Sequence, residues 1–146
     1  MSRRFSFSLL FFWLAVFGLY GQIFETGDIL EIKKHLKPET LVVFDIDNTL
    51  LEPVQSLGSD QWFYLQQRKY CQEGMSAAAA LKRVLAEWVA WQHLAEVQLV
   101  QSEAKPLIEE LQGQHRKVMG LTTRGLEMTF CTSYQFEKLG LDLIAT

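Results

Sequence analysis

The sequence is poor in several features that would assign it to a specialised class of protein. Its two cysteines, Cys71 and Cys131, are too few for a disulfide framework; they can form one pair, but the simpler prediction is two unpaired small apolar residues. No cluster of lysines and arginines occurs and the net charge is only −3, which argues against a nucleic-acid partner. The three histidines lack metal-ligand spacing. With 49% hydrophobic and 21% charged residues in 146, the chain has the composition of one folded globular domain.

The first 22 residues differ from the rest of the chain. Arg3 and Arg4 form a short basic head, residues 5–20 are almost entirely apolar, and Gly21 offers a small residue for cleavage. This layout is typical of a secretory signal peptide, and the apolar stretch is short for a membrane span of about 20 residues. We therefore predict export, to the periplasm or outside the cell, through residues 1–22. An uncleaved membrane anchor, which would be the chain's one contact with a membrane, and a buried first helix are the alternatives.

Three short apolar runs are predicted to form strands. Residues 41–44 and 117–121 have the near-continuous apolar character of buried parallel strands, and residues 141–144 can begin a third. Helical stretches separate the runs, which is the order of an α/β domain with a parallel sheet. Right-handed crossovers bring the carboxyl ends of such strands to one edge, where open α/β sheets bind ligands. We therefore expect Asp45 and Thr122, which follow the first two strands, to lie at the same edge.

The helical stretches are predicted from apolar residues that recur every three or four positions. Residues 59–101 are mainly helical in this pattern, so we predict a helical insertion over residues 55–101, between the first two strands. Pro106 suits the first turn of the next helix. Three residue types mark helix ends: Asp28 as a cap, Gly74 as a break, and Gly140 as a stop. One face of the last helix is predicted to carry Phe130, Tyr134 and Leu139.

Polar residues follow both central strands directly. After the first strand comes Asp45-Ile46-Asp47-Asn48-Thr49, and after the second comes Thr122-Thr123-Arg124-Gly125. An apolar strand followed by Asp-x-Asp-x-Thr resembles the first motif of the haloacid dehalogenase (HAD) superfamily, and the second strand ending in Thr resembles its second motif. The Leu-Thr-Thr-Arg-Gly ending is similar to that of exported, acid-phosphatase-like members. The resemblance covers roughly residues 40–125 and implies a partial Rossmann-like parallel sheet. It also implies that the helical insertion forms a cap over the site.

The resemblance implies a Mg²⁺-dependent phosphomonoester hydrolase acting on a small phosphorylated substrate. Asp45 is expected to be the nucleophile and a metal ligand, forming an aspartyl-phosphate. Asp47 is expected to protonate the leaving oxygen, to activate water afterwards, and to serve as a second metal ligand, in the family through its backbone carbonyl. The predicted substrate-binding residues are Thr49, which also fixes the loop, Thr122, Thr123 and Arg124. Two alternatives stay open: phosphoryl transfer between metabolites, and a helix-capping turn whose carboxylates are merely solvated.

The remainder of a HAD site is not found in the sequence. Family members carry a later Lys or Arg beside the nucleophile and a later acidic pair that completes the Mg²⁺ shell. The residues after Thr122 include Lys138 and Asp142, but neither follows an apolar strand. Residues 23–146 are therefore predicted to be an incomplete domain, either a relic of a longer phosphatase or a small domain completed by another chain. The alternative function is a non-catalytic, secreted or membrane-tethered remnant that binds a ligand or partner; the sequence leaves the oligomeric state open.

Overall fold

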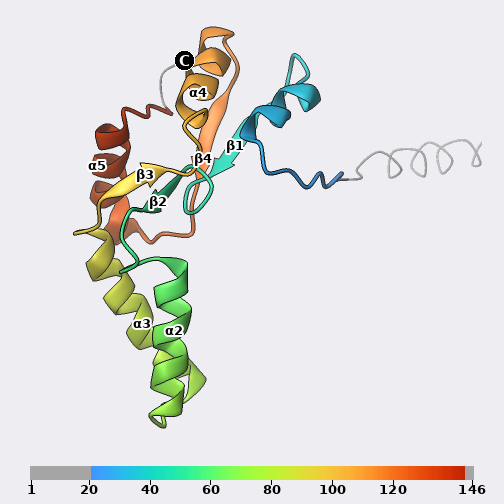
Figure 1. Cartoon of the computed structure of the whole chain (residues 1–146). Helices are drawn as coiled ribbons and strands as arrows, with labels where there is room; N and C mark the ends of the chain where they lie inside the picture. Colours follow the sequence, from blue (N-terminus) through green and yellow to red (C-terminus); the bar gives the residue numbers. More distant parts are fainter. Residues whose placement is uncertain (1–20, 144–146) are drawn as a thin grey trace, which may run out of the picture.

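The computed structural model describes residues 21–143, so the predicted leader lies almost entirely outside the described residues, as does Ile144. Within that range the chain forms a mixed α/β structure (Figure 1). The elements, in chain order, are η1 (Ile29–His35), β1 (Val42–Asp45), β2 (Leu51–Pro53), α2 (Asp60–Gln72), α3 (Ala77–Gln92), β3 (Val97–Leu99), α4 (Ala104–Gly113), β4 (Val118–Leu121), η2 (Leu126–Met128) and α5 (Thr129–Leu139). Among residues 21–143, no helix is both long enough and apolar enough to span a membrane.

A two-stranded parallel sheet lies at the centre of the larger part of the molecule. β1 pairs with β4 in a register that runs from Val42 opposite Val118 to Asp45 opposite Leu121. Both predicted central strands are therefore confirmed. Because the pair is parallel, their carboxyl ends meet at one edge, and the residues that follow them are neighbours there. The predicted third strand is wrong for residues 141–143, which form no strand; Leu141 packs into the core instead.

One face of this sheet is packed and the other is open. Alternate residues of a strand point to opposite faces, and here Val42 and Phe44 are buried. They share a core with side chains of α4 and its surroundings, namely Leu50, Ala104, Leu107, Ile108, Leu111, Val118 and Leu141. On the opposite face the side chains are exposed: Val43 by 44%, Met119 by 43% and Leu121 by 59%. The sheet thus has one apolar face that no other element of residues 21–143 covers.

The predicted helix ends agree with the structure. The Asp28 carboxylate accepts a hydrogen bond from the Leu30 amide at 2.9 Å, although the helix that it caps is a 3₁₀ helix. Pro106 lies in the first turn of α4, as expected from its lack of an amide hydrogen. Gly74 lies between α2 and α3, and Gly140 ends α5 in the left-handed conformation, with φ of 64°. Local sequence therefore determines where these helices stop.

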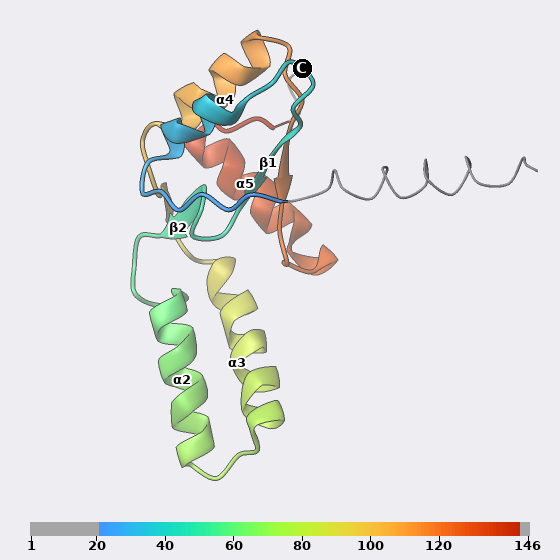
Figure 2. The same cartoon turned by 90° about the vertical axis from the view of Figure 1, so that its right-hand side faces the viewer.

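Helices α2 and α3 stand side by side and project from the rest of the molecule (Figures 1 and 2). Their base is a short antiparallel ribbon in which β2 pairs with β3 from Leu51 opposite Leu99 to Pro53 opposite Val97. We refer to α2 and α3 together as the helical hairpin. The sequence predicted helix as far as residue 101, and this is wrong for β3, because a three-residue strand is too short to show its own period. The helical part of the predicted insertion 55–101 ends at Gln92.

Helix α5 is rotated relative to the face predicted for it. Phe130 and Tyr134, which were expected to share a face with Leu139, are 80% and 49% exposed, and Leu139 is half-buried. The buried residues of α5 are Cys131 and Gln135. The apolar residues predicted to share one face therefore do not form the buried face of α5. A polar side chain, Gln135, lies there instead, held by hydrogen bonds described below.

Candidate functional site

The loop after β1 is a tight turn fixed by backbone hydrogen bonds. The Ile46 amide extends the parallel ladder by donating to the Leu121 carbonyl at 3.1 Å. The Ile46 carbonyl then accepts from the amides of Leu50 and Leu51, at 3.0 and 3.1 Å. Asn48 lies in the left-handed region with φ of 58°, a conformation that asparagine tolerates better than most residues. Because Ile46 and Leu50 are buried, the polar residues of the motif are left on the outer side of the turn.

Asp45 lies at the end of β1 with an exposed side chain. Its Oδ2 accepts a hydrogen bond from the Thr49 hydroxyl at 3.0 Å, across the turn. This contact orients one carboxylate oxygen and agrees with the predicted role of Thr49 in fixing the loop. The arrangement presents a carboxylate to solvent at the carboxyl edge of the sheet.

Asp47 forms the most buried ion pair of the described residues, with Arg124. The Arg124 Nε donates to Oδ1 and Oδ2 of Asp47 at 3.1 and 3.0 Å, and Nη2 donates to Oδ1 at 2.6 Å. The Arg124 side chain is only 2% exposed and that of Asp47 is 28% exposed. The Thr122 hydroxyl lies 3.4 Å from Asp47 Oδ2 and accepts from the Arg124 amide at 3.0 Å. The structure thus brings together three of the predicted site residues, whereas Thr123 is exposed.

The far side of the Arg124 guanidinium is bound by helix α5. Its Nη1 donates to the Thr132 hydroxyl at 3.0 Å and to Gln135 Oε1 at 2.7 Å. The guanidinium also lies 5.9 Å from the centre of the Trp88 ring, on α3. The side chain of Arg124, a predicted substrate-binding residue, is buried and joins three elements of the structure.

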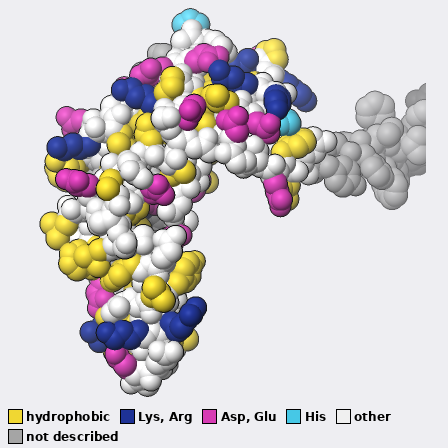
Figure 3. Space-filling model, in the orientation of Figure 1, with side chains coloured by type: hydrophobic (Ala, Val, Ile, Leu, Met, Phe, Trp, Pro, Cys, Tyr) yellow, Lys and Arg dark blue, Asp and Glu magenta, His cyan; other side chains and the backbone are white. Residues whose placement is uncertain are grey.

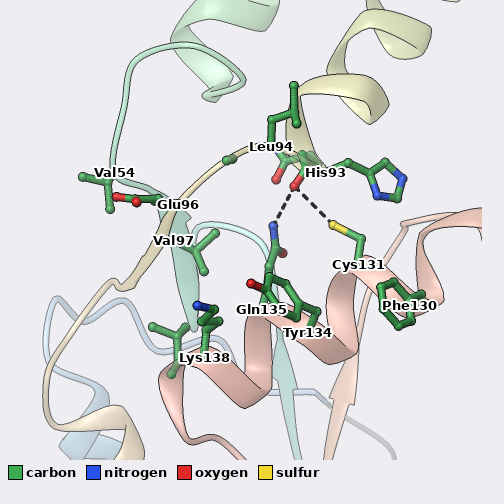
Figure 4. A pocket seen from close by; sticks show the side chains of 13 residues that line it. Val54, His93, Leu94, Glu96, Val97, Phe130, Cys131, Tyr134, Gln135 and Lys138 are labelled. Atoms are coloured by element: carbon green, nitrogen blue, oxygen red, sulfur yellow. Dashed lines mark hydrogen bonds between the residues drawn. The ribbon is translucent and has the colours of Figure 1, made fainter.

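Hydrogen bonds continue from Gln135 to the base of the helical hairpin. Gln135 Nε2 donates to the backbone carbonyl of Gln92 at 3.0 Å, and the Cys131 thiol approaches the same oxygen at 3.2 Å (Figure 4). The Gln92 side chain in turn donates from Nε2 to the Gly58 carbonyl at 2.9 Å. Burial raises the pKa of the Cys131 thiol, Arg124 lowers it less, and Asp47 raises it. Both thiols are free, as the simpler prediction had it, with Cys71 exposed.

Sequence reasoning missed Thr132, Gln135 and Gln92, because single polar residues on helices belong to no motif. The one available signal was the position of Gln135, four residues after Cys131, which places both on one side of a helix.

Two pockets flank this network. One, of about 610 Å³, lies between the end of α3 and α5, and Gln92, Cys131 and Gln135 are among its lining residues (Figure 4). Exposed apolar side chains, including Leu94 and Phe130, line it together with the cationic side chain of Lys138. Apolar side chains also gather on the upper part of the hairpin, and a group of Lys and Arg side chains lies toward its far end (Figure 3). The second, of about 560 Å³, lies along the other side of α5 and is lined partly by Thr122 and Arg124. The second pocket therefore adjoins the carboxyl edge that carries the site.

The donor atoms fit a sparse Mg²⁺ site better than a closed cage. The Asp45 carboxylate is exposed, with one oxygen bound by Thr49, whereas both carboxylate oxygens of Asp47 accept hydrogen bonds from Arg124. No group of three or more His, Cys, Asp or Glu side chains within residues 21–143 is arranged to hold a metal ion. Mg²⁺ commonly uses one or two carboxylates and keeps several waters, so the Asp45 carboxylate and the Asp47 carbonyl would be the groups to hold it.

Comparisons with known proteins place the chain in a family. Residues 25–146 match the family model described as "Protein of unknown function (DUF2608)". The chain belongs to this family. The DUF2608 match includes the motif that begins at Asp45, the loop that ends with Arg124, and the helical hairpin between them.

Two DUF2608-region relatives come from chlamydiae. A Chlamydia pneumoniae protein is 24% identical over 110 residues, which is 75% of this chain and 40% of the relative. A Chlamydia muridarum protein is 27% identical over 85 residues, or 58% of this chain and 33% of the relative. Both are named "Putative outer membrane protein". The chain thus spans two fifths or less of the length of these relatives, and no solved structure matches it significantly.

Proposed function

We propose that this DUF2608 chain carries the nucleophile-bearing part of a Mg²⁺-dependent phosphomonoester hydrolase of the HAD type. The observation that supports the proposal most is the carboxyl edge of the parallel pair. There Asp45 ends one strand with an exposed carboxylate, and Thr122 follows the other within hydrogen-bonding distance of Asp47. In the same proposal, the sheet is the start of a Rossmann-like sheet, residues 23–146 are an incomplete domain, and the helical hairpin is its cap.

The charges around the two aspartates suit a reaction on an anionic substrate. Arg124 neutralises the carboxylate of Asp47, so an incoming phosphate monoester meets one uncompensated carboxylate, that of Asp45, rather than two. A bound Mg²⁺, held by Asp45 and the Asp47 carbonyl, would supply positive charge that offsets the remaining repulsion. Thr49 orients Asp45 so that the carboxylate oxygen not bound by its hydroxyl is left for attack.

The proposed reaction has two steps. In the first, a carboxylate oxygen of Asp45 bonds to phosphorus and the ester bond breaks, with its electron pair leaving on the alcohol oxygen. A stabilised aryl oxide leaves without a proton, whereas an alkoxide takes one from Asp47, which must first be protonated and released from Arg124. In the second, water attacks phosphorus, the bond to Asp45 breaks, and the proton of the water passes to Asp47. Thr122 and Thr123 would hold the phosphoryl oxygens.

Location is part of the same proposal. The names of the two chlamydial relatives refer to the outer membrane, which is compatible with an exported or membrane-associated location of this chain. In our proposal, residues 1–22 direct the export. The substrate would then be a phosphate monoester met outside the cytoplasm.

The test is phosphate release from p-nitrophenyl phosphate with and without Mg²⁺. We expect Mg²⁺-dependent turnover that falls by at least about 100-fold in Asp45→Asn, because loss of a nucleophile is not compensated by the rest of a site. The matched control is Asp60→Asn, which removes an exposed carboxylate on α2 and should leave the rate unchanged.

An Asp45→Asn protein as active as the wild type would refute the mechanism. Absence of turnover in the wild type, together with Mg²⁺ binding that depends on Asp45, would instead support the non-catalytic alternative predicted from the sequence.

A further inference from the structure

A continuous chain of hydrogen bonds joins Asp47 to both ends of the helical hairpin. It runs from Asp47 through Arg124 to Gln135, from Gln135 to the Gln92 carbonyl, and from the Gln92 side chain to Gly58. Gln92 is in the last turn of α3, and Gly58 lies just before α2. The side chains of Arg124, Gln135 and Gln92 are each 2% exposed. We call this series of hydrogen bonds the relay. It is therefore shielded from water along most of its length.

Each glutamine of the relay makes hydrogen bonds in a buried place. If its side chain were replaced by an apolar one, the partners of those hydrogen bonds would be left unsatisfied. The Gln92 carbonyl belongs to the last turn of α3, where no later helical amide is available to it, and Gln135 and Cys131 supply the missing donors. Gln135 uses both ends of its amide, accepting from Arg124 and donating to Gln92. Burial makes such bonds costly to leave unmade, which gives the relay a defined geometry.

The base of the hairpin is closely packed around the end of the relay. Gly58 is buried with φ of 84°, in the left-handed region that favours glycine. A Cβ at this position would lie 3.3 Å from the Trp91 Cβ and 3.5 Å from Gln92 Nε2. A side chain larger than hydrogen at position 58 would therefore press against Trp91 at the base of the hairpin.

We propose that Gln135 is a positioning residue. It holds the Arg124 side chain, and through it the Asp47 carboxylate, at a fixed position relative to the helical hairpin. The consequence for catalysis rests on the proposed function; the positional role itself does not. Asp45 is fixed separately, by the hydrogen bond from Thr49. Gln135 should therefore affect the step that needs Asp47, hydrolysis of the aspartyl-phosphate, more than the attack by Asp45 on an aryl phosphate.

The first measurement reports on Arg124 without any need for activity. The Arg124 Nε–H donates to both Asp47 oxygens and is buried, so its ¹H–¹⁵N signal should be resolved and slow to exchange with water, and Asp47→Asn should shift it. In Gln135→Leu, which cannot hold Nη1, we expect this signal to shift and to exchange at least about tenfold faster. The matched control is Ser133→Ala, an exposed position on the same helix, which should leave it unchanged.

A second variant separates the two ends of the Gln135 amide. Gln135→Glu keeps the oxygen that accepts from Arg124 but loses the donor to the Gln92 carbonyl. We expect the Arg124 signal to be retained, while hydrogen exchange at the amides of residues 56–60 and 90–96 increases. In Gln135→Leu, both the Arg124 signal and these amides should change.

The third measurement is kinetic and uses p-nitrophenyl phosphate. In Gln135→Leu we expect kcat and KM to fall together by about 10- to 100-fold, with kcat/KM little changed, because the slowed step follows the attack by Asp45. The initial burst of nitrophenol should persist, since that step does not require Asp47. Gln135→Glu should restore most of kcat.

The outcomes distinguish this inference from the proposed function. A Gln135→Leu protein whose Arg124 signal matches that of Ser133→Ala would overturn the positioning role, whatever its activity. A shifted signal with unchanged kcat would overturn the catalytic consequence, because the reaction of Asp47 would then not depend on the relay, and would support the positional role alone. A shifted, fast-exchanging signal in a protein whose wild type has no turnover would refute the proposed hydrolase and support the positional role of Gln135.

Discussion

Replacement of Arg124 by methionine is the most informative single test of how this structure is held together. Methionine is unbranched and fills a similar space, so Arg124→Met removes the charge and the donors with limited loss of packing. The wild-type guanidinium donates three hydrogen bonds to Asp47 and one each to Thr132 and Gln135. All of these acceptors lose a partner in the variant.

The expected loss of stability follows from burial on the two sides of the pair. Removing one partner of a fully buried ion pair typically costs about 3–5 kcal/mol. The Asp47 side chain is 28% exposed, so water can partly solvate its carboxylate in the variant and reduce that cost. Gln135 Oε1 adds part of the roughly 1–3 kcal/mol of an unsatisfied buried acceptor. Together we expect the free energy of unfolding to fall by about 2–4 kcal/mol, a large share of the stability of a small domain.

The assay is urea unfolding followed by far-ultraviolet circular dichroism. With a slope of about 1–3 kcal/mol per molar urea, the midpoint should fall by about 1–2 M while the slope stays the same. The control is Lys33→Met, which removes an exposed ion pair with Glu110 whose side chains are 40% and 45% exposed, and which should cost less than about 1 kcal/mol. Arg124→Lys keeps the positive charge but lacks the planar guanidinium with its several donors. Its loss of unfolding free energy should lie between those of Arg124→Met and Lys33→Met. Equal losses in Arg124→Met and Lys33→Met would refute the reasoning.

Two further predictions concern the core and the buried thiol. Leu111 is only 1% exposed, so Leu111→Ala should lower the free energy of unfolding by about 2–5 kcal/mol. Leu121 lies on the open sheet face and is 59% exposed, so Leu121→Ala should change it by less than about 0.5 kcal/mol. Equal effects of the two substitutions in thermal unfolding would contradict the packing described. Because burial raises the pKa of Cys131, stability should fall as the pH rises through the ordinary range of a thiol pKa, where the unfolded chain loses the proton and the folded chain keeps it. This dependence should be absent in Cys131→Ala, and iodoacetamide should label the exposed Cys71 first.

The sequence by itself determined the parts of this protein that depend on neighbouring residues. The apolar runs at residues 41–44 and 117–121 specify β1 and β4, because short, nearly continuous apolar runs suit central parallel strands. The chirality of crossovers then places Asp45 and Thr122 at one edge without any knowledge of contacts. Asp28 and Gly140 determine helix ends through their own side-chain and backbone preferences.

Tertiary structure alone decided the surroundings of that edge. Arg124 is 77 residues from Asp47 in sequence and pairs with it because β4 lies beside β1, which brings the loops after the two strands together. The packing of α5 turned Gln135 inward and left Phe130 exposed, against the hydrophobic pattern of the helix. β2 and β3 are likewise too short to show a period and exist because each pairs with the other. A sequence pattern records the preferences of adjacent residues, whereas the partner of a buried polar group is determined by which elements meet in space.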